Sequence, residues 1–304
     1  MKTILMVLFG VLFAFGSARA APLRVVTTTE DLAAIVREIG GPLVEVESLA
    51  RGSQDPHFLE ARPSLMLKAS RADLFVQVGL GLEAGWASSV LVGARNPAIQ
   101  HGASGYLDAS RGIQPLDVPS GPVDRSQGDV HPFGNPHYWL DPENGKIIAR
   151  TIAERLAALR PESAGRIEEN RKGFERRLDE AIAGWKKRMA PYEGTPVVTY
   201  HNSWAYFARR FGLRVVGYVE PKSGIPPSPA HIQQLIQHMK REKVKVIIID
   251  PYFARSTPDL IARETGARVL VLPPSVGGVE GIRTYFDLFD YLIDQLTMAL
   301  SKGY

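Results

Sequence analysis

The pattern of hydrophobic positions along the chain alternates between two periods. Short runs rich in β-branched residues, typical of strands, are separated by segments whose apolar residues recur every three or four positions, which predicts amphipathic helices. The runs predicted as strands are residues 23–29, 43–50, 73–79, 195–200, 214–219, 244–250 and 268–273. Because a predicted helix follows each strand before the next one in the same half of the chain, we expect the strands to pair in parallel.

The predicted helices carry start and stop signals. Ser228, followed by a proline at the first helical position, marks one helix start, and glycines follow the helices that end near residues 40 and 211. These helices are residues 31–41, 63–72, 202–212, 228–243, 258–266 and 284–301. The strand over residues 244–250 is almost continuously apolar, as expected when helices cover both faces of a sheet.

The middle of the chain differs from both halves. Residues 111–136 are rich in proline and glycine and lack periodicity, which predicts a loop. From Asn144 a helical region follows, interrupted near Pro161, and its part from Glu162 to Ala190 keeps one apolar stripe among many charged residues. At ~1.5 Å per residue this part spans about 40 Å. We therefore expect a rigid connector helix between two lobes.

The sequence thus predicts an α/β protein with two βα lobes, each built on a parallel sheet, joined by the long connector helix. The expected parts are a signal peptide over residues 1–20, an N-terminal lobe over 21–143, a helical connector over 144–190 and a C-terminal lobe over 191–304. Removal of residues 1–20 from the 304-residue chain leaves 284, enough for two ordinary domains.

The first twenty residues have the features of a cleavable export signal. Lys2 supplies positive charge, an apolar run follows, and small residues precede Ala21. The chain has no cysteine, so we expect neither disulfides nor a lipid anchor on cysteine. No later stretch is apolar for long enough to span a bilayer. We expect a periplasmic monomer that is not embedded in the membrane.

The overall charge does not point to a partner. The formal charge of +4 falls to +2 without Lys2 and Arg19, and the basic residues are spread along the chain. Such a small excess argues neither for nor against nucleic-acid binding, and no nucleic-acid partner is expected.

Three of the seven histidines occupy positions typical of a binding site. His57 follows the strand over residues 43–50, His137 ends the Pro/Gly-rich loop, and His201 stands at the carboxyl end of the strand over 195–200. Ligands bind beyond the carboxyl ends of parallel strands. A lone histidine there is more often a capping or packing residue, but three from two lobes suggest a metal site, because neutral imidazole commonly binds divalent transition metals. Their spacing is not a compact metal motif, so convergence in space stays open.

The remaining histidines have weaker claims. His231 and His238 are seven positions apart on one predicted helix, and we interpret them as solvated helix residues. Nothing else metal-like lies near either of them, and His101 also has a weaker claim. His131 is intermediate, because it lies six residues before His137 on a loop that is able to move over a site.

Four stretches of the sequence resemble one known family. They are "DPHFLEARPSLMLKASRADLFVQVGLGLE", "GNPHYWLDPENG", "YHNSWAYFARRFGL" and "GYVEPKSGIPPSPAHIQQLI". In this order they resemble the signature stretches of the metal-specific solute-binding proteins of zinc and manganese ABC importers, and the resemblance runs through nearly the whole chain after the signal. It implies two lobes linked by a rigid helix, one metal in the cleft between them, and delivery of that metal to a membrane permease.

By position, the resemblance implies three metal ligands: His57 from "DPH", His137 from "NPH" and His201 from "YHNSW". The family commonly supplies an aspartate as the fourth ligand after the strand that corresponds to residues 268–273, where this chain has Pro-Pro-Ser. Asp250, at the end of the preceding strand, is the predicted fourth ligand. Alternatively, this aspartate is a helix cap or a hydrogen-bonded core group. In that case the fourth position on the metal is occupied by water or is open.

The expected donor set bears on the identity of the transported metal. Zinc favours tetrahedral, nitrogen-rich sites, whereas manganese favours oxygen ligands, so three histidines with at most one carboxylate favour Zn²⁺ over the alternative, Mn²⁺. Some zinc-binding relatives carry a long loop rich in histidine and acid, but the corresponding loop here offers only Asp124, Asp129 and His131. We therefore do not expect it to buffer several metals.

Two other classes of function compete with metal transport. A periplasmic zinc hydrolase would use three protein ligands and a metal-bound water, together with a general base and oxyanion donors. Glu60, three residues after His57, is the only evident base, and there is neither a His-Glu-x-x-His motif nor a nucleophile elbow. An adhesin role occurs among relatives of the family, but the cleaved, unlipidated terminus fits it less well. The sequence therefore predicts a binding protein and not an enzyme.

Overall fold

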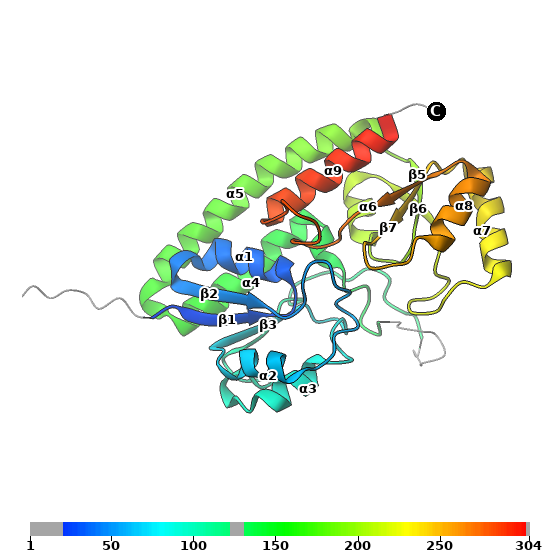
Figure 1. The fold of residues 1–304 in the computed structure, drawn as a ribbon. Coiled ribbons are helices and arrows are strands. Elements are labelled where there is room, and N and C mark those ends of the chain that lie inside the picture. Colours follow the sequence, from blue (N-terminus) through cyan, green and yellow to red (C-terminus); the bar gives the residue numbers. More distant parts are fainter. Residues whose placement is uncertain (1–20, 122–130, 302–304) are drawn as a thin grey trace, which may run out of the picture.

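The computed structural model describes residues 21–121 and 131–301. The predicted signal peptide over residues 1–20 and the loop residues Asp124 and Asp129 lie outside these ranges. Within them the chain forms two four-stranded sheets, in which every strand pairs in parallel with its neighbours. Helices lie against both faces of each sheet (Figure 1). The predicted α/β fold with two lobes is confirmed.

The N-terminal sheet has the strand order β2-β1-β3-β4. Its strands are β1 (Leu23–Thr27), β2 (Val44–Ser48), β3 (Leu74–Gln77) and β4 (Tyr106–Asp108). The helices that cover it are α1 (Glu30–Gly40) and α4 (Pro142–Leu159) on one face and α2 (Pro63–Ser70) and α3 (Ala87–Ala94) on the other. The sequence pattern predicts neither α3 nor β4, because β4 has only three residues and α3 reads "ASSVLVGA", without a clear helical period.

The C-terminal sheet has the equivalent order, β6-β5-β7-β8. Its strands are β5 (Pro196–Thr199), β6 (Arg214–Tyr218), β7 (Val246–Ile249) and β8 (Arg268–Val271). The surrounding helices are α6 (Ala205–Phe211), α7 (Pro229–Glu242), α8 (Ser256–Thr265) and α9 (Tyr285–Ser301). All four residues of β7 are buried, and Ser228 caps α7 by accepting a hydrogen bond from the His231 backbone, so both predictions are confirmed.

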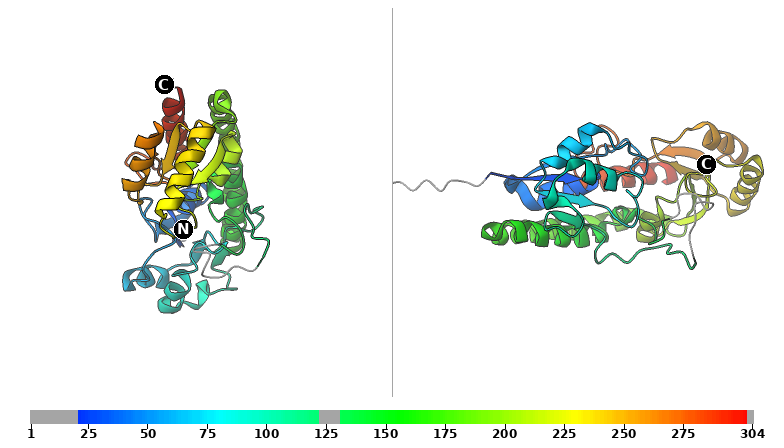
Figure 2. Two further views of the ribbon diagram at one scale, coloured as in Figure 1. Left: turned by 90° about the vertical axis from the view of Figure 1, so that its right-hand side faces the viewer. Right: turned by 90° about the horizontal axis from the view of Figure 1, so that it is seen from below.

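A long helix runs from one lobe to the other. α5 (Ala164–Met189) has 26 residues and, at ~1.5 Å per residue, extends about 39 Å. The predicted interruption is present, since α4 ends at Leu159 and a short 3₁₀ turn precedes α5. The C-terminal helix α9 returns beside α5, and Trp185 stacks on Phe289 with ring centroids 5.0 Å apart (Figure 1). Figure 2 shows the elongated molecule that results.

Short 3₁₀ helices complete the described parts of the chain. They are η1 (Gly41–Leu43), η2 (Pro97–Ile99), η4 (Tyr138–Leu140), η5 (Pro161–Ser163) and η6 (Ala190–Tyr192). Across residues 21–121 and 131–301, none of the helices combines the length and the apolar character that a bilayer crossing requires.

The buried apolar side chains form one shared layer and two separate ones. A single cluster includes residues from the inner faces of both sheets and from α4, α5, α6 and α9. A second cluster lies between the first sheet and its outer helices α2 and α3, and a third lies between the second sheet and α7 and α8. The two lobes are therefore joined by a packed core as well as by the chain that connects them.

Candidate metal centre

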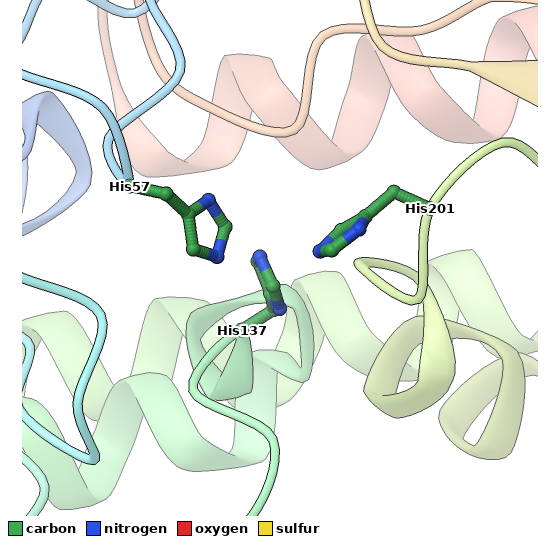
Figure 3. Close-up of side chains that lie close together, drawn as sticks. All are labelled: His57, His137 and His201. Atoms are coloured by element: carbon green, nitrogen blue, oxygen red, sulfur yellow. The ribbon is translucent and has the colours of Figure 1, made fainter. Parts of the chain in front are cut away.

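Three histidines from three loops meet between the lobes. His57 lies between β2 and α2, His137 directly precedes η4, and His201 follows the end of β5 by two residues. One ligand atom from each lies within 4.8 Å of the other two. The ring centroids are 5.0 Å apart for His57 and His137, and 5.3 Å for each pair that includes His201. Figure 3 shows the three rings pointing toward one another.

The two histidines of the N-terminal half are held by the same local device, an Asp or Asn two residues earlier. Oδ1 of Asp55 accepts a hydrogen bond from the backbone N–H of His57 at 3.0 Å and lies 2.7 Å from its Nδ1. Oδ1 of Asn135 makes the same two contacts with His137, at 3.0 and 2.9 Å. With Nδ1–H donating to this oxygen, Nε2 carries a lone pair that is available to a metal. Nε2 of both histidines is buried and has no hydrogen-bond partner within the described ranges.

The third histidine is oriented from a neighbouring strand. Nδ1 of His201 lies 3.6 Å from Oε2 of Glu220, which follows β6, and both side chains are buried. Burial acts to lower the pKa of His201, but its pairing with the Glu220 carboxylate outweighs burial and raises the pKa above the usual value. The backbone N–H of Gly224 donates to the same carboxylate. At a given pH a larger fraction of His201 than of an ordinary histidine is therefore protonated, and a metal that binds this ring must displace that proton.

Burial keeps two other imidazoles neutral. It holds the pKa of His137 well below the usual value, and the nearby His57 and His201 act in the same direction. It also lowers the pKa of His131 to about 3. A neutral ring is the form that binds metal, so protons do not compete at these two positions near neutral pH.

Asp250 lies at the carboxyl end of β7, as predicted, but does not join the three-histidine group. Its Oδ2 accepts hydrogen bonds from Ser203 Oγ at 2.8 Å and the Tyr252 hydroxyl at 3.2 Å, and its Oδ1 accepts one from Trp204 Nε1 at 2.8 Å. Burial raises its pKa to about 6, against the effect of these donors. The carboxylate thus fixes the turn that follows His201. Its role as a metal ligand stays a prediction.

The other histidines fall into two groups. The ring centroid of His131 lies 5.2 Å from that of His57, at the edge of the three-histidine group. His101 instead packs on Tyr106 with centroids 4.4 Å apart, and His231 and His238 lie on α7. These last three lie outside the three-histidine group, and Nε2 of His231 lies 3.0 Å from the Tyr218 carbonyl, so the His231 ring is half-buried and not simply solvated.

The stretch "HPFGNPHYWLDP" also ties the two lobes together. Nδ2 of Asn135 donates to the Asn202 carbonyl at 2.8 Å, and the Tyr206 hydroxyl donates to the Asn135 carbonyl at 2.8 Å. Trp139 Nε1 donates to the Pro274 carbonyl at 2.8 Å. Asn135 therefore orients His137 and, at the same time, holds the loop that carries His201.

The residues that orient the histidines were missed by sequence reasoning. Asp55 and Asn135 carry a visible signal, since each stands two positions before its histidine with a proline between them. Glu220 has no such signal, because it meets His201 only when β5 and β6 pair in parallel.

A cavity of about 270 Å³ lies beside the histidines. Its lining includes His131, His137 and His201 together with the acidic Asp117 and Glu220. Carboxylates in a recess raise the local concentration of cations. The cavity therefore offers a route by which a hydrated cation can approach the histidines.

The chain is similar to known metal-binding proteins along nearly its whole length. The family described as "zinc-uptake complex component A periplasmic" matches residues 25–299. The manganese ABC transporter substrate-binding lipoprotein of Streptococcus anginosus is 26% identical over 289 residues, which cover 92% of this chain and 90% of that protein. The high-affinity zinc uptake system protein of Brucella suis is 32% identical over 167 residues, or 55% of this chain and 50% of that protein.

Solved structures share the fold. A crystal structure of ZnuA has a TM-score of 0.77 at 26% identity, with 91% of this chain and 99% of that chain covered. The laminin-binding adhesin of Streptococcus agalactiae has a TM-score of 0.77 at 25% identity, with the same coverage. Both likenesses extend over the two lobes and the helix that joins them.

Proposed function

The chain belongs to the family of periplasmic zinc-uptake components, and from this premise we propose that it binds one divalent transition metal, Zn²⁺ in preference to Mn²⁺, and delivers it to the permease of an ABC importer. The family and the similar transport proteins bind substrate for ABC transporters. The protein is therefore a metal-binding transport component and not an enzyme.

The observation that carries the proposal is the set of three buried imidazoles whose ligand atoms face one another. A buried polar atom without a hydrogen bond costs about 1–3 kcal/mol. Nε2 of both His57 and His137 is in that position within the described ranges. A metal ion relieves this cost at both atoms at once. We propose His57, His137 and His201 as its ligands.

The donor set supports zinc as the transported metal. All three proposed ligands are nitrogens, and the carboxylates of Asp55 and Glu220 act on the rings from behind. Zinc accepts such a nitrogen-rich set, whereas manganese prefers direct oxygen ligands. Asp250, the predicted oxygen ligand, would have to exchange hydrogen bonds from three donors for the metal.

We further propose that the protein works as a monomer in the periplasm after removal of residues 1–20. In this proposal the N-terminal lobe (21–143) and the C-terminal lobe (191–304) each supply ligands, and the helical region over 144–190 holds them in register. The permease would meet both lobes at the face where the site opens.

Metal analysis of untagged protein tests the proposed function. After removal of metal with a chelator, calorimetric titration should give one tight zinc per chain, because residues 21–121 and 131–301 contain one group of three converging histidines. In competition, equimolar zinc should displace manganese. Two or more equivalent tight sites, or manganese retained against equimolar zinc, would contradict the proposal.

A further inference from the structure

His131 adds a fourth imidazole to the three already described. Its ring centroid lies 5.2 Å from that of His57, close to the spacing within the three-histidine group, and 6.4 Å from that of His137. Its Nε2 is buried and has no hydrogen-bond partner in residues 21–121 or 131–301. The atom thus shares the unsatisfied state of Nε2 in His57 and His137, although the family resemblance gives it no role.

The turn after β3 orients the His131 ring. A Cβ on Gly81 would lie 3.5 Å from Nδ1 of His131, so this nitrogen faces the Gly81 backbone, with which the ring forms a hydrogen bond. Gly81 has a φ of +89°, a conformation that favours glycine. The buried Glu83 carboxylate holds the same turn by accepting hydrogen bonds from the backbone of Val78 and Gly79. With Nδ1 engaged, Nε2 is the nitrogen left to bind metal.

The backbone on the other side of His131 is anchored as well. The N–H of Gly134 donates to the His131 carbonyl at 3.1 Å, and the N–H of Asn135 donates to the Leu116 carbonyl at 2.7 Å. A Cβ on Gly134 would come within 2.7 Å of that Leu116 oxygen, so the two loop segments that contain Leu116 and Gly134 approach each other closely. His131 is therefore four residues from the asparagine that orients His137, on one short, fixed turn.

We propose that His131 is the fourth ligand, so that the bound metal has four imidazole nitrogens in place of three with Asp250 or water. This proposal rests on the proposed function. Structural zinc sites are four-coordinate and tetrahedral. The charge of the ion is offset by the carboxylates of Asp55 and Glu220, which lie behind two of the rings. The ligand atom of His131 lies outside the 4.8 Å group, so the proposal requires its side chain to rotate toward the metal while the backbone turn stays in place.

Four nitrogen ligands also bear on metal selectivity. Replacing an oxygen ligand or a water by imidazole favours zinc over manganese, because manganese prefers oxygen. The loss of His131 should therefore weaken zinc binding more than manganese binding, and the preference for zinc should fall.

X-ray absorption and zinc affinity together test this ligand. Zinc-loaded wild-type protein should show four imidazoles, and His131→Ala should show three with an added oxygen. The zinc affinity of His131→Ala should be lower than that of the wild type by at least about tenfold. Even the loss of a group that only orients a ligand lowers metal affinity about 10–100-fold. His238→Ala removes a histidine from α7, away from the site, and should leave affinity and ligand count unchanged. His131→Gln keeps a polar side chain of similar length and should lose affinity like the alanine variant.

The outcomes separate this proposal from the one on which it rests. One zinc per chain with three imidazoles in both the wild type and His131→Ala, at equal affinity, overturns the fourth ligand and leaves the proposed function intact. Wild-type protein that binds no zinc overturns both. Metal-free melting temperatures of all variants show whether a loss of affinity reflects a loss of folded protein.

Discussion

The two halves of the molecule orient their histidines in different ways. In the N-terminal half, His57 and His137 are each held by a side chain two residues earlier, so the orienting contact is local in sequence. In the C-terminal half, His201 is held by Glu220 from the adjacent strand. The contact that orients His57 or His137 lies within a single tripeptide. The contact between Glu220 and His201 forms only when β5 and β6 pair.

This difference divides the chemical tasks at the site. Burial favours the neutral, metal-binding form of His137, whereas Glu220 favours the protonated form of His201. His137 is thus ready to bind a metal, whereas His201 would give up a proton as the metal binds. Competition between protons and metal is therefore expected to be stronger at His201 than at His137.

Removal of a ligand from either half should have the largest effect. Zinc affinity should fall by about 100-fold or more in each of the variants His57→Ala, His137→Ala and His201→Ala. Loss of a group that only orients a ligand lowers metal affinity about 10–100-fold, and loss of the ligand itself should cost more. Titration against a chromogenic chelator measures this loss. His231→Ala and His238→Ala should bind zinc like the wild type. If both sets behave alike, the ligand assignment is wrong.

Loss of the local device should have the next largest effect. Asp55→Ala leaves Nδ1 of His57 without its acceptor and should weaken zinc binding about 10–100-fold. Asp55→Asn should cost much less, because Asn135 already performs this task for His137 with an amide oxygen. Equal losses in the two variants would show that the negative charge, and not the acceptor, is what Asp55 contributes.

The contact between strands should be visible in the pH dependence. The raised pKa of His201 means that the metal-free site holds a proton at this ring up to a higher pH than an ordinary histidine, so wild-type zinc affinity should fall as the pH drops from 7 toward 5. Glu220→Gln removes the negative charge, lowers that pKa and should make the fall shallower. Affinities measured at several pH values in this window test the comparison. Parallel curves for the two proteins would contradict it.

Asp250→Asn should have the smallest effect on zinc affinity. The amide nitrogen must face at least one of the donors from Ser203, Trp204 and Tyr252, so metal-free stability should fall by about 1–3 kcal/mol. Zinc should still raise the melting temperature by nearly the wild-type amount. Thermal melts with and without zinc check both parts. A clearly smaller zinc-induced rise would instead make Asp250 a ligand.

Much of the fold could be predicted because its signals are local. The buried stripe of α5, which includes Phe174, Leu178 and Trp185, follows from apolar spacing, and β7 follows from an unbroken apolar run. β4 escapes prediction because it has three residues, and its place at the edge of the sheet depends on pairing with β3. Periodicity cannot reveal a strand that short.

The site was predictable to a similar degree. Strand ends and the family resemblance select His57, His137 and His201, which the structure brings together. The surroundings of Asp250 were not predictable, because its three hydrogen-bond donors come from the turn after His201 and from Tyr252, and only folding aims them at one carboxylate. Long-range polar contacts of this kind leave no periodic trace in a sequence.

The apolar cluster that includes residues of both sheets and of α4, α5 and α9 has a consequence for how the protein moves. Bending one lobe away from the other would separate these packed side chains and expose apolar surface to water. The free-energy cost is proportional to the area exposed. Because both lobes contribute to this cluster, unfolding of one lobe is expected to destabilise the other. Uptake and release of the metal are therefore expected to involve small displacements of the loops around the site and not a large rigid-body closure of the two lobes.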